Sequence, residues 1–148
     1  MLKYTQPVLI IMKFLNNFFD KFKGFAPLPI RIILGIVLIF HGWSKLINIG
    51  GTTQFFDSVG IPIAAVFAVV VALLEFAGGI LILIGLLTRI TSLFLTIEFL
   101  VVLLLLGIKR GFTAQTELEL FVFACSLALL LIGSGRLALA HVLMKKKD

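Results

Sequence analysis

Four long apolar runs are the feature that most restricts how this 148-residue chain can fold. Each has roughly the length that an α-helix needs to cross the hydrocarbon core of a bilayer, about 20 residues. The runs are Leu28–Ile47, Ile61–Leu87, Ile90–Ile108 and Leu118–Ile132. With 61% hydrophobic residues and a mean hydropathy of +1.21, the composition lies far outside the range of soluble domains. The sequence therefore predicts an all-α fold, a polytopic membrane four-helix bundle.

The N-terminal residues 1–27 predict a separate amphipathic helix that lies in the membrane interface. On a helix, one stripe is apolar, formed by Val8, Ile11, Leu15, Phe18, Phe19 and Phe22. The opposite side is polar, and nearby lysines can bind anionic headgroups while the stripe is buried among lipids. A solvated, charged tail is the alternative. The four-span domain is expected over 28–141, followed by a basic cytoplasmic tail at 142–148.

The distribution of basic residues predicts the orientation. With four spans, ten of the 13 Lys and Arg residues fall on the side of both termini, and the positive-inside rule makes that side cytoplasmic. We therefore assign the net charge of +6 to a membrane surface and expect no nucleic-acid partner. The single cysteine, Cys125, excludes an internal disulfide, and no metal, haem or flavin motif is evident. The remaining three basic residues fall on the membrane side opposite the termini, and they are Lys45, Lys109 and Arg110.

Two acids lie near the middle of apolar runs. Glu75 is central in the second run and Glu98 in the third. A charged side chain at the bilayer centre costs about 2.5–3.5 kcal/mol on insertion scales, so such residues usually face protein and have a functional or pairing role. Gly78 and Gly79 share the helix face of Glu75, and small residues let a second helix approach closely. We therefore expect Glu75 to face another span.

The first run supplies candidate partners for these acids. His41 lies slightly beyond its midpoint, and Lys45 follows one turn later. We hypothesise one intramembrane polar cluster of His41, Lys45, Glu75 and Glu98. The alternatives are that His41 is a hydrogen-bonded packing residue and that Lys45, near the end of its span, extends to the headgroups.

Further residues have expected roles at the helix ends and contacts. At the cytoplasmic face, Arg31, Arg89 and Arg136 are expected to bind lipid phosphate or a partner protein. Thr116 and Glu119 predict a capping box for the fourth span, which makes Glu119 structural. Thr88 is expected to cap the third span, and Thr52 or Thr53 a short helix before Gly60. Helix packing is assigned to Gly35, Gly42, Gly78, Gly79 and Gly85.

An ordered set of motifs resembles the DoxX/DoxD family of small four-helix membrane proteins. The motifs are Arg31-Ile-Ile-Leu-Gly35, His41-Gly42-Trp-Ser-Lys45, Gly60-Ile-Pro62, Glu75-x-x-Gly78-Gly79-x-Leu81 and Gly85-Leu-Leu-Thr88-Arg89. The likeness covers about 29–141. It implies a four-span bundle in the bacterial cytoplasmic (inner) membrane. One branch of the family is a membrane subunit associated with thiosulfate:quinone oxidoreductase, and other members are linked to thiol and oxidative-stress systems.

Three classes of function are compatible with the sequence. In the first, the chain is a quinone-binding or anchoring subunit of a redox complex, with a non-covalently bound quinone and electrons from a partner protein. In the second, it is a transporter-like or lipid-binding protein for a small solute, which would require a homodimer. In the third, it is a non-catalytic membrane assembly factor in which the charges only fix helix register.

Overall fold

A computed structural model describes residues 5–141, and within that range the chain is helical without a strand. The expected basic tail at 142–148 lies outside the described residues. In chain order, the elements are α1 (Thr5–Asp20), the 3₁₀ turn η1 (Lys23–Phe25), α2 (Pro27–Ile47), α3 (Ile49–Ser58), α4 (Ala64–Ile84), α5 (Thr88–Val102), the π-helical turn η2 (Leu103–Gly107), α6 (Ile108–Arg110) and α7 (Ala114–Ile132).

Four helical segments are long and apolar enough to cross a membrane. They are Lys23–Ile47, Ala64–Ile84, Thr88–Arg110 and Ala114–Ile132. The prediction of an all-α membrane bundle with four spans is therefore confirmed. The third span consists of three consecutive elements, because α5 continues through the π turn η2 into α6.

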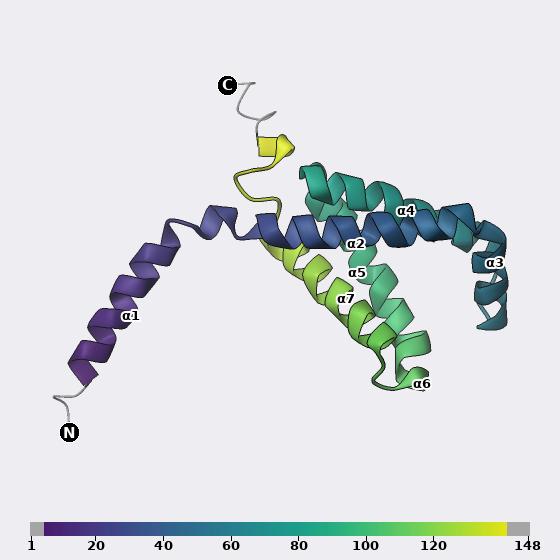
Figure 1. Cartoon of the computed structure of the whole chain (residues 1–148), viewed down its shortest axis with the longest axis horizontal. Helices are drawn as coiled ribbons and strands as arrows, with labels where there is room; N and C mark the ends of the chain where they lie inside the picture. The colour runs from purple at the N-terminus through teal and green to yellow at the C-terminus, as the bar shows by residue number, and fades with distance from the viewer. Residues whose placement is uncertain (1–4, 142–148) are drawn as a thin grey trace.

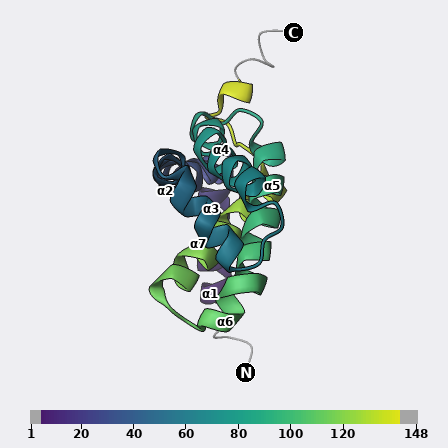
Figure 2. The ribbon, with the colours of Figure 1, turned by 90° about the vertical axis from the view of Figure 1, so that its right-hand side faces the viewer.

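The four spans pack as two helix pairs (Figures 1 and 2). The most extensive contacts join α2 to α4 and α5 to α7, while α3 links the first pair at one end. In Figure 1 the second pair runs obliquely away from the first. The shared core contains residues of all four spans, so the two pairs form one bundle. The buried residues of this hydrophobic core are Leu34, Leu38, Ile82, Leu95, Phe99, Val122 and Leu129.

Glycines allow α2 and α4 to touch through their backbones. A Cβ atom on Gly35 would lie 2.9 Å from the carbonyl oxygen of Gly79, and one on Gly79 would lie 2.9 Å from that of Gly35. A Cβ on Gly42 would overlap the backbone nitrogen of Phe76. Gly78 faces the other way, toward Thr91 of α5. Small residues therefore set the spacing of α2 and α4.

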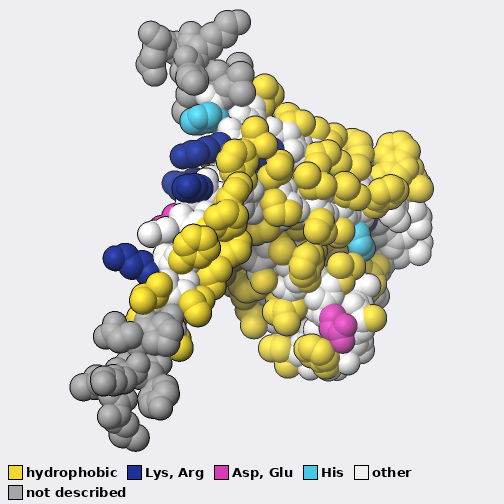
Figure 3. All heavy atoms as spheres, turned by 60° about the vertical axis from the view of Figure 1, so that its left-hand side comes forward, with side chains coloured by type: hydrophobic (Ala, Val, Ile, Leu, Met, Phe, Trp, Pro, Cys, Tyr) yellow, Lys and Arg dark blue, Asp and Glu magenta, His cyan; other side chains and the backbone are white. Residues whose placement is uncertain are grey.

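Helix α1 extends away from the bundle (Figure 1). Its apolar side chains from Val8 to Phe19 are between 44% and 69% exposed, so they pack on no other described element. Figure 3 shows dark-blue Lys and Arg side chains on the side of the molecule where α1 and the C-terminal segment leave the bundle. The interfacial position of this helix stays a prediction, and exposed apolar side chains beside cations are the features that it requires.

Two expected helix caps are wrong because the helices begin at other residues. Helix α7 begins earlier than expected: the N-cap is Thr113, whose hydroxyl accepts a hydrogen bond from the backbone N–H of Thr116 at 3.3 Å. Helix α5 has no side-chain cap, since the N-cap Leu87 is in a left-handed conformation with φ of 51°. The hydroxyl of Thr88 is buried without a hydrogen-bond partner among the described residues.

The start of α3 also differs from expectation. Asn48, and not a threonine, is its N-cap, and its side-chain oxygen accepts from the N–H of Gly51 at 3.2 Å. The Thr52 and Thr53 hydroxyls instead donate to backbone carbonyls one turn earlier. Asparagine immediately before the first helical residue is a favoured cap. Asn48 is the only residue between α2 and α3, so the sequence does not separate the end of one helix from the start of the next.

We predict that Gly42→Ala destabilises the bundle, because its new methyl group would collide with the backbone of α4. Overpacking of this kind costs about 1–3 kcal/mol. Thermal unfolding in detergent measures the change. The matched control is Gly50→Ala in α3, where an added Cβ meets no atom within 4 Å. Equal stability of the two variants would contradict the close approach of α2 and α4.

Candidate functional site

An ion pair between α2 and α4 lies inside the bundle. Lys45, close to the end of α2, directs its Nζ atom to Oε2 of Glu75 in the middle of α4. The Lys45 side chain is 27% exposed and that of Glu75 is 2% exposed. The lysine therefore connects the buried acid with the surface of the bundle.

Glu98 of α5 is the second acid at this ion pair. Its carboxyl group is close enough to that of Glu75 for a side-chain hydrogen bond, and it lies within electrostatic reach of Lys45. The Oε2 atom of Glu98 is buried and accepts no hydrogen bond from the described residues. Three helices thus bring two carboxyl groups and one ammonium group together. We call Lys45, Glu75 and Glu98 the acid cluster.

His41, the fourth residue of the hypothesised cluster, is not joined to it. The imidazole is half-buried on α2, and no hydrogen bond or ion pair connects it to the described residues. An aromatic contact lies nearby instead: Trp43 of α2 and Phe76 of α4 have ring centroids 5.8 Å apart. The structure therefore brings together three of the four hypothesised residues.

Arg31 is buried, which corrects its assignment to a lipid- or partner-binding face. It is 1% exposed, and its guanidinium donates to four backbone carbonyls at the end of α4 and in the segment after α7. Carbonyl oxygens at a helix C-terminus lack partners within the helix and favour a positive charge. Arg31 is thus a structural clamp. The acceptors are Ile82 and Leu83, both at 2.9 Å, and Ser134 and Leu137, both at 2.8 Å.

Gly85 gives the guanidinium of Arg31 its space. It ends α4 in a left-handed conformation with φ of 75°, and a Cβ atom there would lie 2.5 Å from Nη2 of Arg31. The carbonyl of Gly85 also accepts from the N–H of Ala140 at 3.4 Å. The C-terminal segment is therefore tied to the same end of the bundle as Arg31.

Arg89 and Arg136 remain exposed at that end. The guanidinium of Arg89 donates to the carbonyl of Leu131 at 3.3 Å. The backbone N–H of Arg136 donates to the carbonyl of Gly24 at 2.8 Å, and its side chain covers that glycine. Binding of lipid phosphate or a partner protein stays a prediction for these two residues.

Glu119 pairs with Arg110 instead of closing a capping box. Nη2 of Arg110 donates to both carboxylate oxygens of Glu119, at 2.8 and 3.0 Å. Glu119 is 5% exposed, and its pairing with Arg110 agrees with the structural role expected for it. The signal in the sequence was an arginine at the end of one span and an acid at the start of the next. The pair fastens the turn between α6 and α7.

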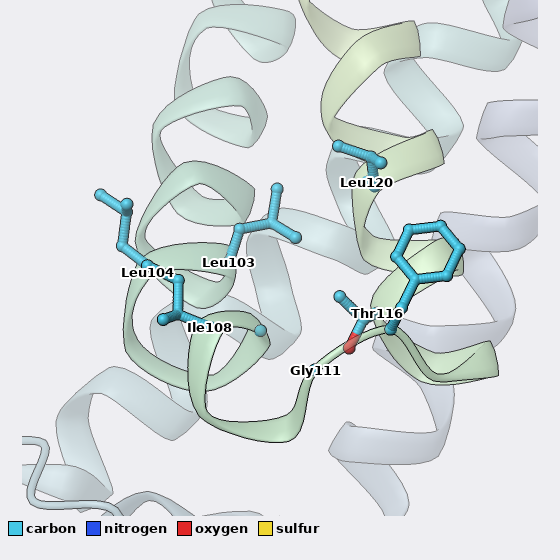
Figure 4. A pocket seen from close by; sticks show the side chains of 8 residues that line it. Leu103, Leu104, Ile108, Gly111, Thr116 and Leu120 are labelled. Carbon is cyan, nitrogen blue, oxygen red and sulfur yellow. The ribbon is translucent and has the colours of Figure 1, made fainter.

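An apolar groove lies at the same turn (Figure 4). It has a volume of about 330 Å³ and opens beside the π turn η2. No residue of the acid cluster lines it, so the ionisable chemistry of the bundle lies elsewhere. The sequence shows no sign of this groove, because a π turn has no distinct pattern of its own. The lining residues are Leu103, Leu104, Gly107, Ile108, Gly111, Phe112, Thr116 and Leu120.

The described part of the chain contains no cluster of three or more metal-binding side chains. No three His, Cys, Asp or Glu side chains there lie close enough together to hold an ion. Cys125 is a half-buried free thiol in α7. The arrangement best suited to chemistry is therefore the acid cluster, which can exchange protons and donate hydrogen bonds from Lys45.

Comparison with known proteins gives a family and several relatives. The DoxX family model matches residues 26–109. A protein of Bacillus subtilis (strain 168) named "Putative oxidoreductase CatD" is 35% identical over 120 residues, which cover 81% of this chain and 88% of that protein. Two Escherichia coli (strain K12) proteins are also similar. "Inner membrane protein YqjF" is 40% identical over 74 residues, and "Inner membrane protein YphA" is 32% identical over 59.

These two matches cover 55% of YqjF and 42% of YphA, and 50% and 40% of this chain. No solved structure matches the chain.

We predict that Arg31→Lys destabilises the protein strongly, although the charge is kept. A lysine cannot reproduce the guanidinium's four carbonyl contacts, and hydrogen bonds to charged groups contribute about 1.5–3 kcal/mol each. Thermal unfolding in detergent measures the loss. Arg89→Lys, at an exposed position with one long hydrogen bond, is the control and should leave the midpoint unchanged. An equal midpoint in both variants would contradict the clamp.

Proposed function

Because the chain belongs to the DoxX family, we propose that it is the quinone-binding or anchoring membrane subunit of a redox complex linked to sulfur, thiol or oxidative-stress metabolism. The chain is a membrane protein with four spans, and two relatives are named as inner membrane proteins. A third relative is named "Putative oxidoreductase CatD". We propose a bacterial inner membrane location with both termini in the cytoplasm.

The acid cluster is the observation on which this proposal rests. A quinone site needs an apolar slot, a hydrogen-bond donor near the quinone carbonyl and an acid–base group nearby. The Lys45 ammonium has three N–H donors, and its pairing with Glu75 leaves others for a ligand. The partial exposure of Lys45 offers a quinone in the bilayer a route to that donor.

The chemistry divides between this chain and a partner. Reduction of a quinone to a quinol consumes two electrons and two protons. We propose that the electrons come from a redox protein bound to this subunit and that the acid cluster takes part in the proton transfer. Arg89 and Arg136, exposed at the proposed cytoplasmic end, are the candidate contacts for an acidic surface of that partner.

Trp43 gives a direct test of quinone binding. It is the sole tryptophan of the chain, and it contacts Phe76, the neighbour of Glu75. We predict that a short-chain quinone quenches Trp43 fluorescence of the purified protein saturably. Glu75→Gln, which removes the charge that holds Lys45, should weaken the apparent affinity roughly tenfold, the effect of one charged hydrogen bond.

The control is Glu117→Gln, an exposed acid in the first turn of α7 that should leave the titration unchanged. Circular dichroism verifies that each variant is folded. Quenching that never saturates in the unmodified protein would contradict quinone binding. Saturable quenching with equal affinity in Glu75→Gln would remove Glu75 from the site.

A further inference from the structure

We propose that Glu75 and Glu98 hold one proton between them, which makes the acid cluster a proton-binding site inside the bundle. The inference rests on the arrangement of three side chains. It holds whether or not a quinone binds, and it therefore goes beyond the proposed function.

The contact between the two carboxyl groups requires the proton. Their side chains approach to hydrogen-bonding range. An ionised carboxylate has acceptor oxygens and no donor, so two ionised carboxylates repel each other at this distance. A single shared proton turns one group into a donor and makes the contact attractive. Paired acids in aspartic proteases share one proton for the same reason.

The charge balance of the cluster gives a second, independent reason. Among the described residues, α2 contributes the ammonium of Lys45, α4 contributes Glu75 and α5 contributes Glu98. On α7, the buried acid Glu119 is already paired with Arg110. His41 is not bonded to the cluster, so it supplies no fixed positive charge there.

With both acids ionised, the cluster would carry one uncompensated negative charge within the apolar interior. Burying an unpaired charge costs several kcal/mol even after relaxation. One bound proton makes the three-residue cluster neutral: an ammonium, a carboxylate and a carboxylic acid. The Oε2 atom of Glu98 is buried and has no hydrogen-bond partner among the described residues.

The proton shared by the two carboxyl groups can be transferred to a bound ligand. Transfer of the shared proton to a ligand at Lys45 that gains negative charge would leave two carboxylates and one ammonium, so the cluster would regain its neutral state by taking up another proton. For the proposed quinone function, the cluster would supply one of the two protons of reduction. The partial exposure of Lys45 marks the side from which such a ligand would approach.

Infrared spectroscopy of the purified full chain tests the proposal. A protonated carboxyl group has a carbonyl stretch that is separate from the carboxylate bands and shifts in heavy water. We expect this band at neutral pH in the unmodified protein and its loss in Glu75→Gln and in Glu98→Gln. In either variant, the remaining acid is balanced by Lys45 and ionises. Glu117→Gln should retain the band.

Absence of the band in the unmodified protein would overturn the proposal. This outcome does not depend on whether the variants fold. A band that persists in both cluster variants would also overturn it, because the proton would then reside on another acid. A band that forms only after sodium ions are removed would show that the two carboxyl groups hold a metal cation instead. If the unmodified protein shows the band but binds no quinone, the quinone function is rejected and the proton site is retained.

Discussion

The backbone contact between α2 and α4 is the constraint on which the rest of the structure depends. Gly35 and Gly79 each leave room for the other's carbonyl, and Gly42 leaves room for the backbone of Phe76. In a bilayer, where lipid is as apolar as leucine, such close packing is a main source of helix association. It also fixes the register in which Lys45 meets Glu75 and Arg31 meets the end of α4.

The two ends of this helix pair use positive charge differently. Arg31 is buried among four carbonyl groups, which occupy its guanidinium, so its position indicates stabilisation of the fold. Lys45 faces two acids and is partly exposed. Its cluster carries one excess negative charge unless a proton is bound. The contrast between a satisfied and an unbalanced charge is the physical reason for placing chemistry at Lys45 and not at Arg31.

The sequence predicts the spans and the pairing of Glu75 well, because bilayer thickness and the cost of a buried charge are strong constraints. It could not predict the burial of Arg31. A basic residue near the end of a span looks the same whether it extends to lipid or turns inward, and backbone carbonyls have no sequence signature. The Arg110–Glu119 pair and the groove at η2 were missed for a related reason, since both depend on how a turn folds.

The central claim, that the α2–α4 contact places Lys45 against Glu75 as an interacting pair, is tested most directly by a double-mutant cycle. Unfolding free energies in detergent would be compared for Lys45→Met, Glu75→Gln and the double variant. The account predicts strong coupling, with the double variant losing less than the sum of the single losses by roughly 1–3 kcal/mol. Losses that simply add would contradict it.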